Sequence, residues 1–279
     1  MRMTIFRSDR LAIALVGAIL APIFAKATAQ QASIEAAIAP STSSQTQARA
    51  AAPTIRPGEF YAAPWVDAAG GPPNAGSIVG TGDVPAIPLT EAERPLQSHE
   101  RIFITVPPGM SSAAGTRYIA VRRGPMIEGT GQVMIPTGIL AVERAQPGQA
   151  VEARVVARFE PVQIGDQVVS MESLPANLPR PVAVGGGAQT RVVWIKSEPV
   201  LPSLQSYVVV ATAGMRIGDQ ITFYRERRTT SSGVVLPESD IAVAQIVRST
   251  AHGSTALIIN QTYGAIEEGT PARVSAKMP

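Results

Sequence analysis

The fold of this 279-residue chain is decided by a stretch that occurs twice. Residues 102–110 read Ile-Phe-Ile-Thr-Val-Pro-Pro-Gly-Met, and residues 207–215 read Tyr-Val-Val-Val-Ala-Thr-Ala-Gly-Met. Runs of β-branched and aromatic residues that stop at proline or glycine are typical of short β-strands. Two such runs, separated by the length of a small domain, indicate an internal duplication.

Two further matches support the duplication. The turn Gly115-Thr116 corresponds to Gly218-Asp219, and residues 159–166 correspond to residues 263–270. All three matches lie 103 to 105 residues apart and share their glycines and the phase of their apolar residues. No segment of about ten or more residues has a helical period. We therefore predict an all-β chain with two tandem small barrel-like or sandwich-like domains of similar topology.

The predicted strands are short apolar runs separated by Gly, Pro, Asn or Ser. In the first copy they are residues 77–80, 102–106, 117–122, 131–135, 139–144, 150–159 and 167–171, and in the second 191–196, 207–212, 220–225, 241–249, 255–262 and 272–276. The predicted parts are a signal peptide at 1–29, a flexible linker at 30–57, a first β-domain with an N-terminal docking segment at 58–175, a linker at 176–190 and a second β-domain at 191–279.

The N-terminus predicts export. Three arginines precede the apolar run Leu11–Phe24, and the small residues 25–29 follow it, which is the order of zones in a cleavable signal peptide. Cleavage is expected after Ala29 or Ala27. The run is shorter than the ~20 apolar residues that span a bilayer, although an uncleaved anchor remains the alternative.

Removing this segment changes the charge of the chain. Four of the 24 Lys and Arg and one of the 21 acidic residues lie in it, so the mature chain carries 20 of each. A neutral chain gives no electrostatic argument for nucleic-acid binding. The chain also has no cysteine, which excludes disulfides and a lipid-bearing cysteine. These features favour a bacterial periplasm or cell surface.

Four segments resemble a known family. Residues 57–65, the step 136–139, the turn 162–166 and the terminal residues 276–279 resemble the paired β-domain region that follows LysM in LysM-containing bacterial envelope proteins. The resemblance covers about residues 57–279 and implies an envelope location and an interaction role. No LysM-like pattern precedes Gly58, so peptidoglycan binding is not carried over to any residue.

Residues suited to catalysis or metal binding are few. The chain has two histidines, His99 and His252. A hydrolase triad of His252 with Asp240 and Ser254 or Ser239 can be written, but a solvated hairpin turn is the commoner role of such residues. No histidine pair or acidic cluster has the spacing of metal ligands. We predict no enzyme activity, no cofactor and no metal site.

Two groups of residues remain as candidates for binding. Arg225, Arg227 and Arg228, echoed by Arg122 and Arg123 in the first copy, are predicted at hairpin tips, where guanidinium groups can contact carboxylates or phosphates of a partner. A solvated, edge-protecting charge run is the alternative.

The second group is aromatic. Phe60, Tyr61 and Trp65 are predicted to dock onto a folded domain, or alternatively to form an exposed stacking surface, for which Trp194 is a further candidate. The sequence thus predicts a non-catalytic periplasmic scaffold or accessory subunit that docks onto an envelope protein or a membrane protein complex. The alternative is a module that binds cell-wall glycan, peptidoglycan included, or a small ligand.

Overall fold

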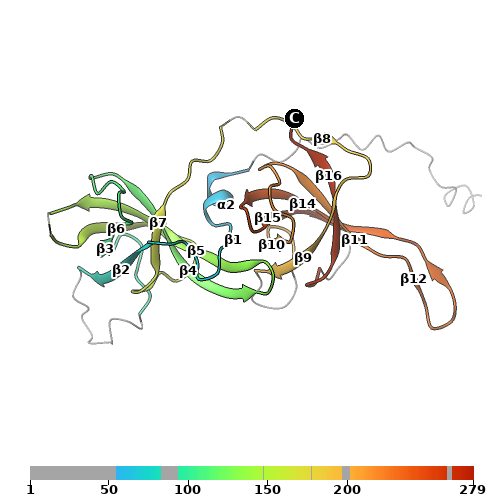
Figure 1. Ribbon diagram of the computed structural model, residues 1–279, viewed down its shortest axis with the longest axis horizontal. Helices are drawn as coiled ribbons and strands as arrows, with labels where there is room; N and C mark the ends of the chain where they lie inside the picture. The colour runs from blue at the N-terminus through green and yellow to red at the C-terminus, as the bar shows by residue number, and fades with distance from the viewer. Residues whose placement is uncertain (1–54, 83–93, 147, 177, 197–201, 263–265) are drawn as a thin grey trace, which may run out of the picture. The chain divides into compact units, whose positions relative to one another are not determined.

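The computed structural model describes residues 55–279 except 83–93, 147, 177, 197–201 and 263–265 (Figure 1). The predicted signal peptide and nearly all of the first linker therefore lie outside the described residues. Within them the chain forms sixteen strands and one helix of five residues, which confirms the all-β prediction. No helix in the described part has the length and apolarity needed to cross a membrane.

Six strands of the first copy close into a barrel. In chain order they are β2 (Gly76–Thr81), β3 (Arg101–Thr105), β4 (Arg117–Ile127), β5 (Gly131–Arg144), β6 (Val151–Arg158) and β7 (Gln167–Ser170). Their order around the ring is β4-β5-β6-β3-β2-β7, and β7 pairs back onto β4. All of these pairs are antiparallel. The short strand β1 (Trp65–Asp67) adds to the outside of the ring on β5.

The second copy repeats this ring. Its strands are β9 (Gln189–Ile195), β10 (Tyr207–Val210), β11 (Gln220–Arg225), β14 (Ser239–Ser249), β15 (Ser254–Gln261) and β16 (Pro271–Lys277). Their order is β11-β14-β15-β10-β9-β16, and β16 pairs back onto β11. Numbered from one to six in chain order, both barrels read 3-4-5-2-1-6, so the two copies share one topology.

Two small additions distinguish the second barrel. The strand β8 (Val182–Ala183) pairs with β16. Between β11 and β14, the strands β12 (Arg228–Thr229) and β13 (Val235–Leu236) form a two-stranded ribbon, which continues outward from β11 in Figure 1. Strands of two residues carry no recognisable alternation, and the sequence did not predict them.

Backbone hydrogen bonds place the repeated turns in equivalent positions. In the first barrel Gly115 N donates to Val142 O at 2.8 Å, and Val142 N donates to Thr116 O at 2.9 Å. In the second, Gly218 N and Ile246 O make the same bond at 2.8 Å, and Ile246 N returns one to Asp219. Both turns thus clamp the fourth strand of their barrel in the same way.

The first of the three sequence matches is displaced by one residue. Ile102 on β3 lies opposite Ala153, and Val208 on β10 lies opposite Ala256. Ile102 and Val208 are both fully buried and therefore equivalent, whereas the sequence comparison aligned Ile102 with Tyr207. The structural separation of these two strands is 106 residues, not 105.

The fourth strand of the first barrel is continuous. The sequence predicted two strands, 131–135 and 139–144, with a break at Pro136, but β5 runs through all fourteen residues. Pro136 and Gly138 both pair with β4, and Thr137 between them is an inserted residue at a register shift. A bulge accommodates proline because the ladder is already interrupted there.

Each barrel encloses its own core of alternating side chains. On β3 the burial alternates strictly, with Ile102 and Ile104 inside. Fully burying such a side chain contributes about 1.5–3 kcal/mol. The largest members of the first core are Tyr118, Ile78, Leu96 and Leu140, and those of the second are Phe223, Ile221, Ile246 and Ile258.

Residues 56–67, which we call the clasp, contact both barrels. The helix α2 (Pro57–Tyr61) starts at a proline, and the Glu59 carboxylate accepts a hydrogen bond from Arg56 N at 2.8 Å. Phe60 is buried against Val247 on β14 and Leu257 on β15. A few residues further on, β1 pairs with β5 of the first barrel.

Side chains of the second barrel also hydrogen-bond to the clasp backbone. Thr255 Oγ1 donates to Pro64 O at 2.7 Å, and Thr250 Oγ1 donates to Val66 O at 2.7 Å. Tyr207 OH donates to Glu59 O at 2.9 Å. The sequence assigned the docking segment to the first β-domain; in the structure it is held by both.

Candidate partner-binding surface

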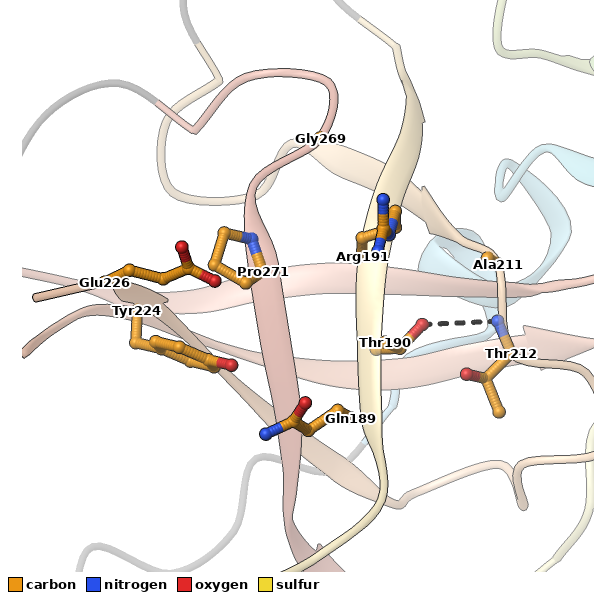
Figure 2. Close-up of a pocket in the computed structure, with 9 residues that line it drawn as sticks. All are labelled: Gln189, Thr190, Arg191, Ala211, Thr212, Tyr224, Glu226, Gly269 and Pro271. Atoms are coloured by element: carbon orange, nitrogen blue, oxygen red, sulfur yellow. Dashed lines mark hydrogen bonds between the residues drawn. The ribbon is translucent and has the colours of Figure 1, made fainter.

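A hollow of about 520 Å³ lies over three neighbouring strands of the second barrel, β9, β16 and β11 (Figure 2). Figure 2 shows Thr190 and Arg191 of β9 on one side of Pro271, and Tyr224 and Glu226 on the other. Thr212 N donates to Thr190 Oγ1 at 3.2 Å, which fixes the chain that follows β10 against β9. The lining residues are Gln189, Thr190, Arg191, Ala211, Thr212, Tyr224, Glu226, Gly269 and Pro271.

A second hollow, of about 590 Å³, shares part of this wall. It has Tyr224, Glu226 and Pro271 in common with the first, and it adds Arg225, Arg227, Arg228, Ile241, Glu267 and Thr270. We call the two together the arginine hollow. Its charged residues are Arg191, Arg225, Arg227, Arg228, Glu226 and Glu267, all of them exposed.

The first barrel has a hollow in the equivalent place. It measures about 480 Å³ and is lined by residues 75–77, 121–123 and 165–167, which belong to strands one, three and six of that barrel or adjoin them. Strand three pairs with strand six in both barrels, Ala120 with Val168 and Phe223 with Ala272, and in each barrel an arginine lies two residues further along strand three. This register makes Arg122 the counterpart of Arg225.

Arg122 is held by a buried carboxylate. Its Nε and Nη2 donate to Asp166 at 3.1 and 3.2 Å, and Nη2 also donates to Pro161 O at 2.5 Å. Asp166, which is 5% exposed, further accepts hydrogen bonds from Thr137 Oγ1 at 2.9 Å and Gln163 N at 3.0 Å. A carboxylate accepts about four such bonds, so that of Asp166 is fully used.

Arg225 has no such partner among the described residues. The position of Asp166 is taken by Thr270, whose hydroxyl accepts only the turn hydrogen bond from Glu267 N at 2.9 Å. The position of Thr137 is taken by Ile241, which supplies no donor. The second barrel thus keeps the arginine of this site without its acidic ligand.

The predicted arginines do not lie at hairpin tips. β4 continues five residues beyond Arg122 to Ile127, and Arg225 is the last residue of β11, at the base of the β12–β13 ribbon. Arg123 is exposed on β4, while Arg227 and Arg228 continue the chain from Arg225 into the ribbon. The structure thus gathers Arg225, Arg227 and Arg228 at one hollow and leaves Arg122 engaged within its own barrel.

Two of the four candidate aromatic residues are buried. Phe60 is 1% exposed and Trp65 is 6% exposed, whereas Tyr61 and Trp194 are half-buried. Trp65 packs on Ile119, Val121 and Met134 of the first barrel. Phe60 and Trp65 therefore have no free face on which a glycan could stack.

A buried arginine, which the sequence reading missed, covers these rings. The Arg248 guanidinium lies 3.8 Å from the centroid of Trp65 and 5.8 Å from that of Phe60, and it forms an ion pair with Glu172 at 3.3 Å. Burial lowers the pKa of Arg248, and Glu172 opposes that shift. A charged residue in the apolar run of β14 was the available signal.

The residues of the conceivable hydrolase triad are far apart. Asp240 lies at the start of β14 and pairs with Arg273, whereas His252 follows the far end of that strand. At ~3.4 Å per residue, the nine residues from Asp240 to Ser249 span about 30 Å. The Ser254 hydroxyl is fully buried and hydrogen-bonded to Ser249 at 3.0 Å.

The carboxylate of the Gly218-Asp219 turn binds backbone amides. Asp219 accepts hydrogen bonds from Arg216 N at 2.9 Å and Met278 N at 2.7 Å, which fastens the C-terminal residues to the second barrel. In the described part of the chain, no group of three or more His, Cys, Asp or Glu could hold a metal ion.

Comparison of the sequence with models of protein families and with curated proteins finds no match in either set.

Proposed function

We propose that this chain is a non-catalytic scaffold or accessory subunit of the bacterial cell envelope, exported by its N-terminal segment to the periplasm or cell surface. It binds an envelope protein or a membrane protein complex through the second barrel. The observation that carries the proposal is the arginine hollow, where the second copy of the site has the arginine but no internal carboxylate beside it.

The chemistry of the barrels supports a binding role. Exposed guanidinium groups form paired, directional hydrogen bonds with carboxylates and phosphates, so they are suited to recognition. In the first barrel the equivalent arginine, Arg122, binds Asp166 and stabilises the barrel itself. In the proposed scaffold the second barrel binds the partner, and the first barrel supports the second.

The clasp supports the same proposal. Its residues contact the second barrel through a buried core and three side-chain hydrogen bonds, and they contact the first through the pairing of β1 with β5. A partner that binds the second barrel is therefore connected, through the clasp, to the first barrel as well.

The test is co-purification from native membranes in mild detergent after crosslinking in cells. The variant with Arg225, Arg227 and Arg228 all replaced by serine is expected to lose its partner while keeping its thermal midpoint. Arg117→Ser, at an exposed position at the start of β4, is the matched control and is expected to keep the partner. Recovery of the wild-type chain as a lone monomer under all conditions would refute the proposal.

A further inference from the structure

The two hollows allow the ligand of the second to be inferred from the first. They occupy the same strands of two barrels with one topology, and each has an arginine at the same register position of strand three. In the first barrel that arginine faces the carboxylate of Asp166, the residue just before strand six. The internal ligand of this site is therefore an aspartate side chain.

The second barrel lacks the ligand and one of the ligand's donors. Thr270 replaces Asp166 and Ile241 replaces Thr137, so neither a carboxylate nor the hydroxyl that supported it remains. The Thr270 hydroxyl still serves the turn, as the Asp166 carboxylate does through Gln163 N. The turn is thus preserved in both barrels, and what differs is the anion beside the arginine.

The charges around Arg225 favour an anionic group. Arg191, Arg227 and Arg228 add positive charge to the hollow, and none of them forms an ion pair among the described residues. Glu226 and Glu267 lie on the same wall and reduce the net charge to about two. This net charge attracts carboxylates and phosphates alike, and the carboxylate that Arg122 binds in the first barrel favours a carboxylate in this hollow.

We propose that the arginine hollow receives an aspartate or glutamate side chain from an acidic segment of a partner protein, with Arg225 as the principal contact. This proposal rests on the proposed function and names the partner's chemistry. The partner's carboxylate takes, between chains, the place that Asp166 takes within the first barrel. Arg225 then makes the paired hydrogen bonds that Arg122 makes in its own barrel.

The proposal is tested with the full chain purified after export and a fluorescein-labelled short peptide of alternating aspartate and glycine. Fluorescence anisotropy is expected to show saturable binding that weakens as salt is added. Arg225→Gln is expected to weaken binding by about tenfold, and the asparagine-glycine peptide is expected to bind at least about tenfold more weakly than the acidic one. Arg117→Ser is the matched control and is expected to bind the acidic peptide like the wild type.

Substituting at each site the residue that the other site has, at positions 166 and 270, gives a second, independent measurement. Thr270→Asp supplies the missing carboxylate within the barrel, so it is expected to raise the thermal midpoint and to weaken peptide binding by about tenfold. Asp166→Thr frees Arg122, so it is expected to lower the thermal midpoint and to add a second bound peptide per chain by titration calorimetry. If the latter variant does not fold, Arg225→Gln and Thr270→Asp still decide the question.

Three results would overturn the inference. They are equal binding of the acidic peptide by the wild type and Arg225→Gln, equal binding by Thr270→Asp, or binding of a phosphoserine peptide in place of the acidic one. If the peptide fails while co-purification still depends on the three arginines, the ligand chemistry is wrong and the scaffold proposal stands. If the peptide binds while no partner co-purifies, the hollow is correct and the scaffold proposal fails.

Discussion

Asp166→Ala is expected to destabilise the first barrel well beyond the loss of one hydrogen bond. The carboxylate of Asp166 accepts four hydrogen bonds, from Arg122 Nε and Nη2, Thr137 Oγ1 and Gln163 N, at 2.9 to 3.2 Å. Alanine removes both oxygens, so all four donors lose their acceptor. Thr137 is fully buried and would be left without its acceptor.

The expected loss follows from the exposure of each partner. A hydrogen bond to a charged group contributes about 1.5–3 kcal/mol, and an unsatisfied buried hydroxyl costs about 1–3 kcal/mol. The side chain of Arg122 is 36% exposed, so water replaces part of what its guanidinium loses. We therefore expect Asp166→Ala to lower the free energy of unfolding by about 2–4 kcal/mol.

Urea denaturation at neutral pH, followed by circular dichroism, measures this loss. With a urea dependence of about 1–3 kcal/mol per molar, the midpoint is expected to fall by roughly 1–2 M. Thr270→Val, at the equivalent position of the second barrel, is the matched control. It removes one hydrogen bond, from Glu267 N, and is expected to cost only about 0.5–1.5 kcal/mol. Equal midpoints for the two variants would refute the reasoning.

Three further predictions concern the clasp and a buried acid. Trp65→Ala removes a side chain that is 6% exposed and stacks on Arg248, so urea denaturation is expected to show a loss of about 3–5 kcal/mol; a loss below about 1 kcal/mol would contradict the packing. Burial, and then Glu59, raise the pKa of Tyr207 to about 12, so ultraviolet titration of Tyr207→Phe is expected to lack the last tyrosine transition; an unchanged curve would place this hydroxyl in water. Burial raises the pKa of Glu100, but hydrogen bonds from an arginine, a backbone amide and a hydroxyl outweigh it, and the pKa falls below its ordinary value of 4.5. A lowered folded-state pKa gives stability above pH 4.5 that is lost as the pH falls through the folded value. The stability of Glu100→Gln is therefore expected to depend less on pH between about 5 and 3 than that of the wild type. Parallel curves of stability against pH for the two proteins would refute this.

The strands of the barrels were predictable because their cores impose a period of two. Ile102 and Ile104 point inward from β3 while their neighbours are exposed, and this alternation is visible in the sequence. The duplication was visible because its turns need glycine at left-handed positions, as at Gly115 and Gly218. The register of strand two could not be read from glycines alone, since its turn places His99 at a positive φ of 68°.

The clasp and the site depended on contacts between distant residues. β1 has three residues, too few for a periodic signal, and its partner on β5 lies some seventy residues away. The equivalence of Arg122 and Arg225 could be read from the repeat, and so could that of Asp166 and Thr270. Their juxtaposition could not, because it requires strand three to lie beside strand six.

The clasp also imposes an order of events on a chain made from its N-terminus. The carbonyl of Pro64 has its hydrogen bond only after Thr255 has been synthesised, 191 residues later. Glu59 and Tyr207, which form another of these hydrogen bonds, are 148 residues apart. Until β14 and β15 exist, Phe60 has no apolar surface of the second barrel to cover it. A chain that stops early therefore displays this aromatic segment to proteases and chaperones, while a complete chain conceals it. Burial of Phe60 therefore requires that β14 and β15 have been synthesised and have folded.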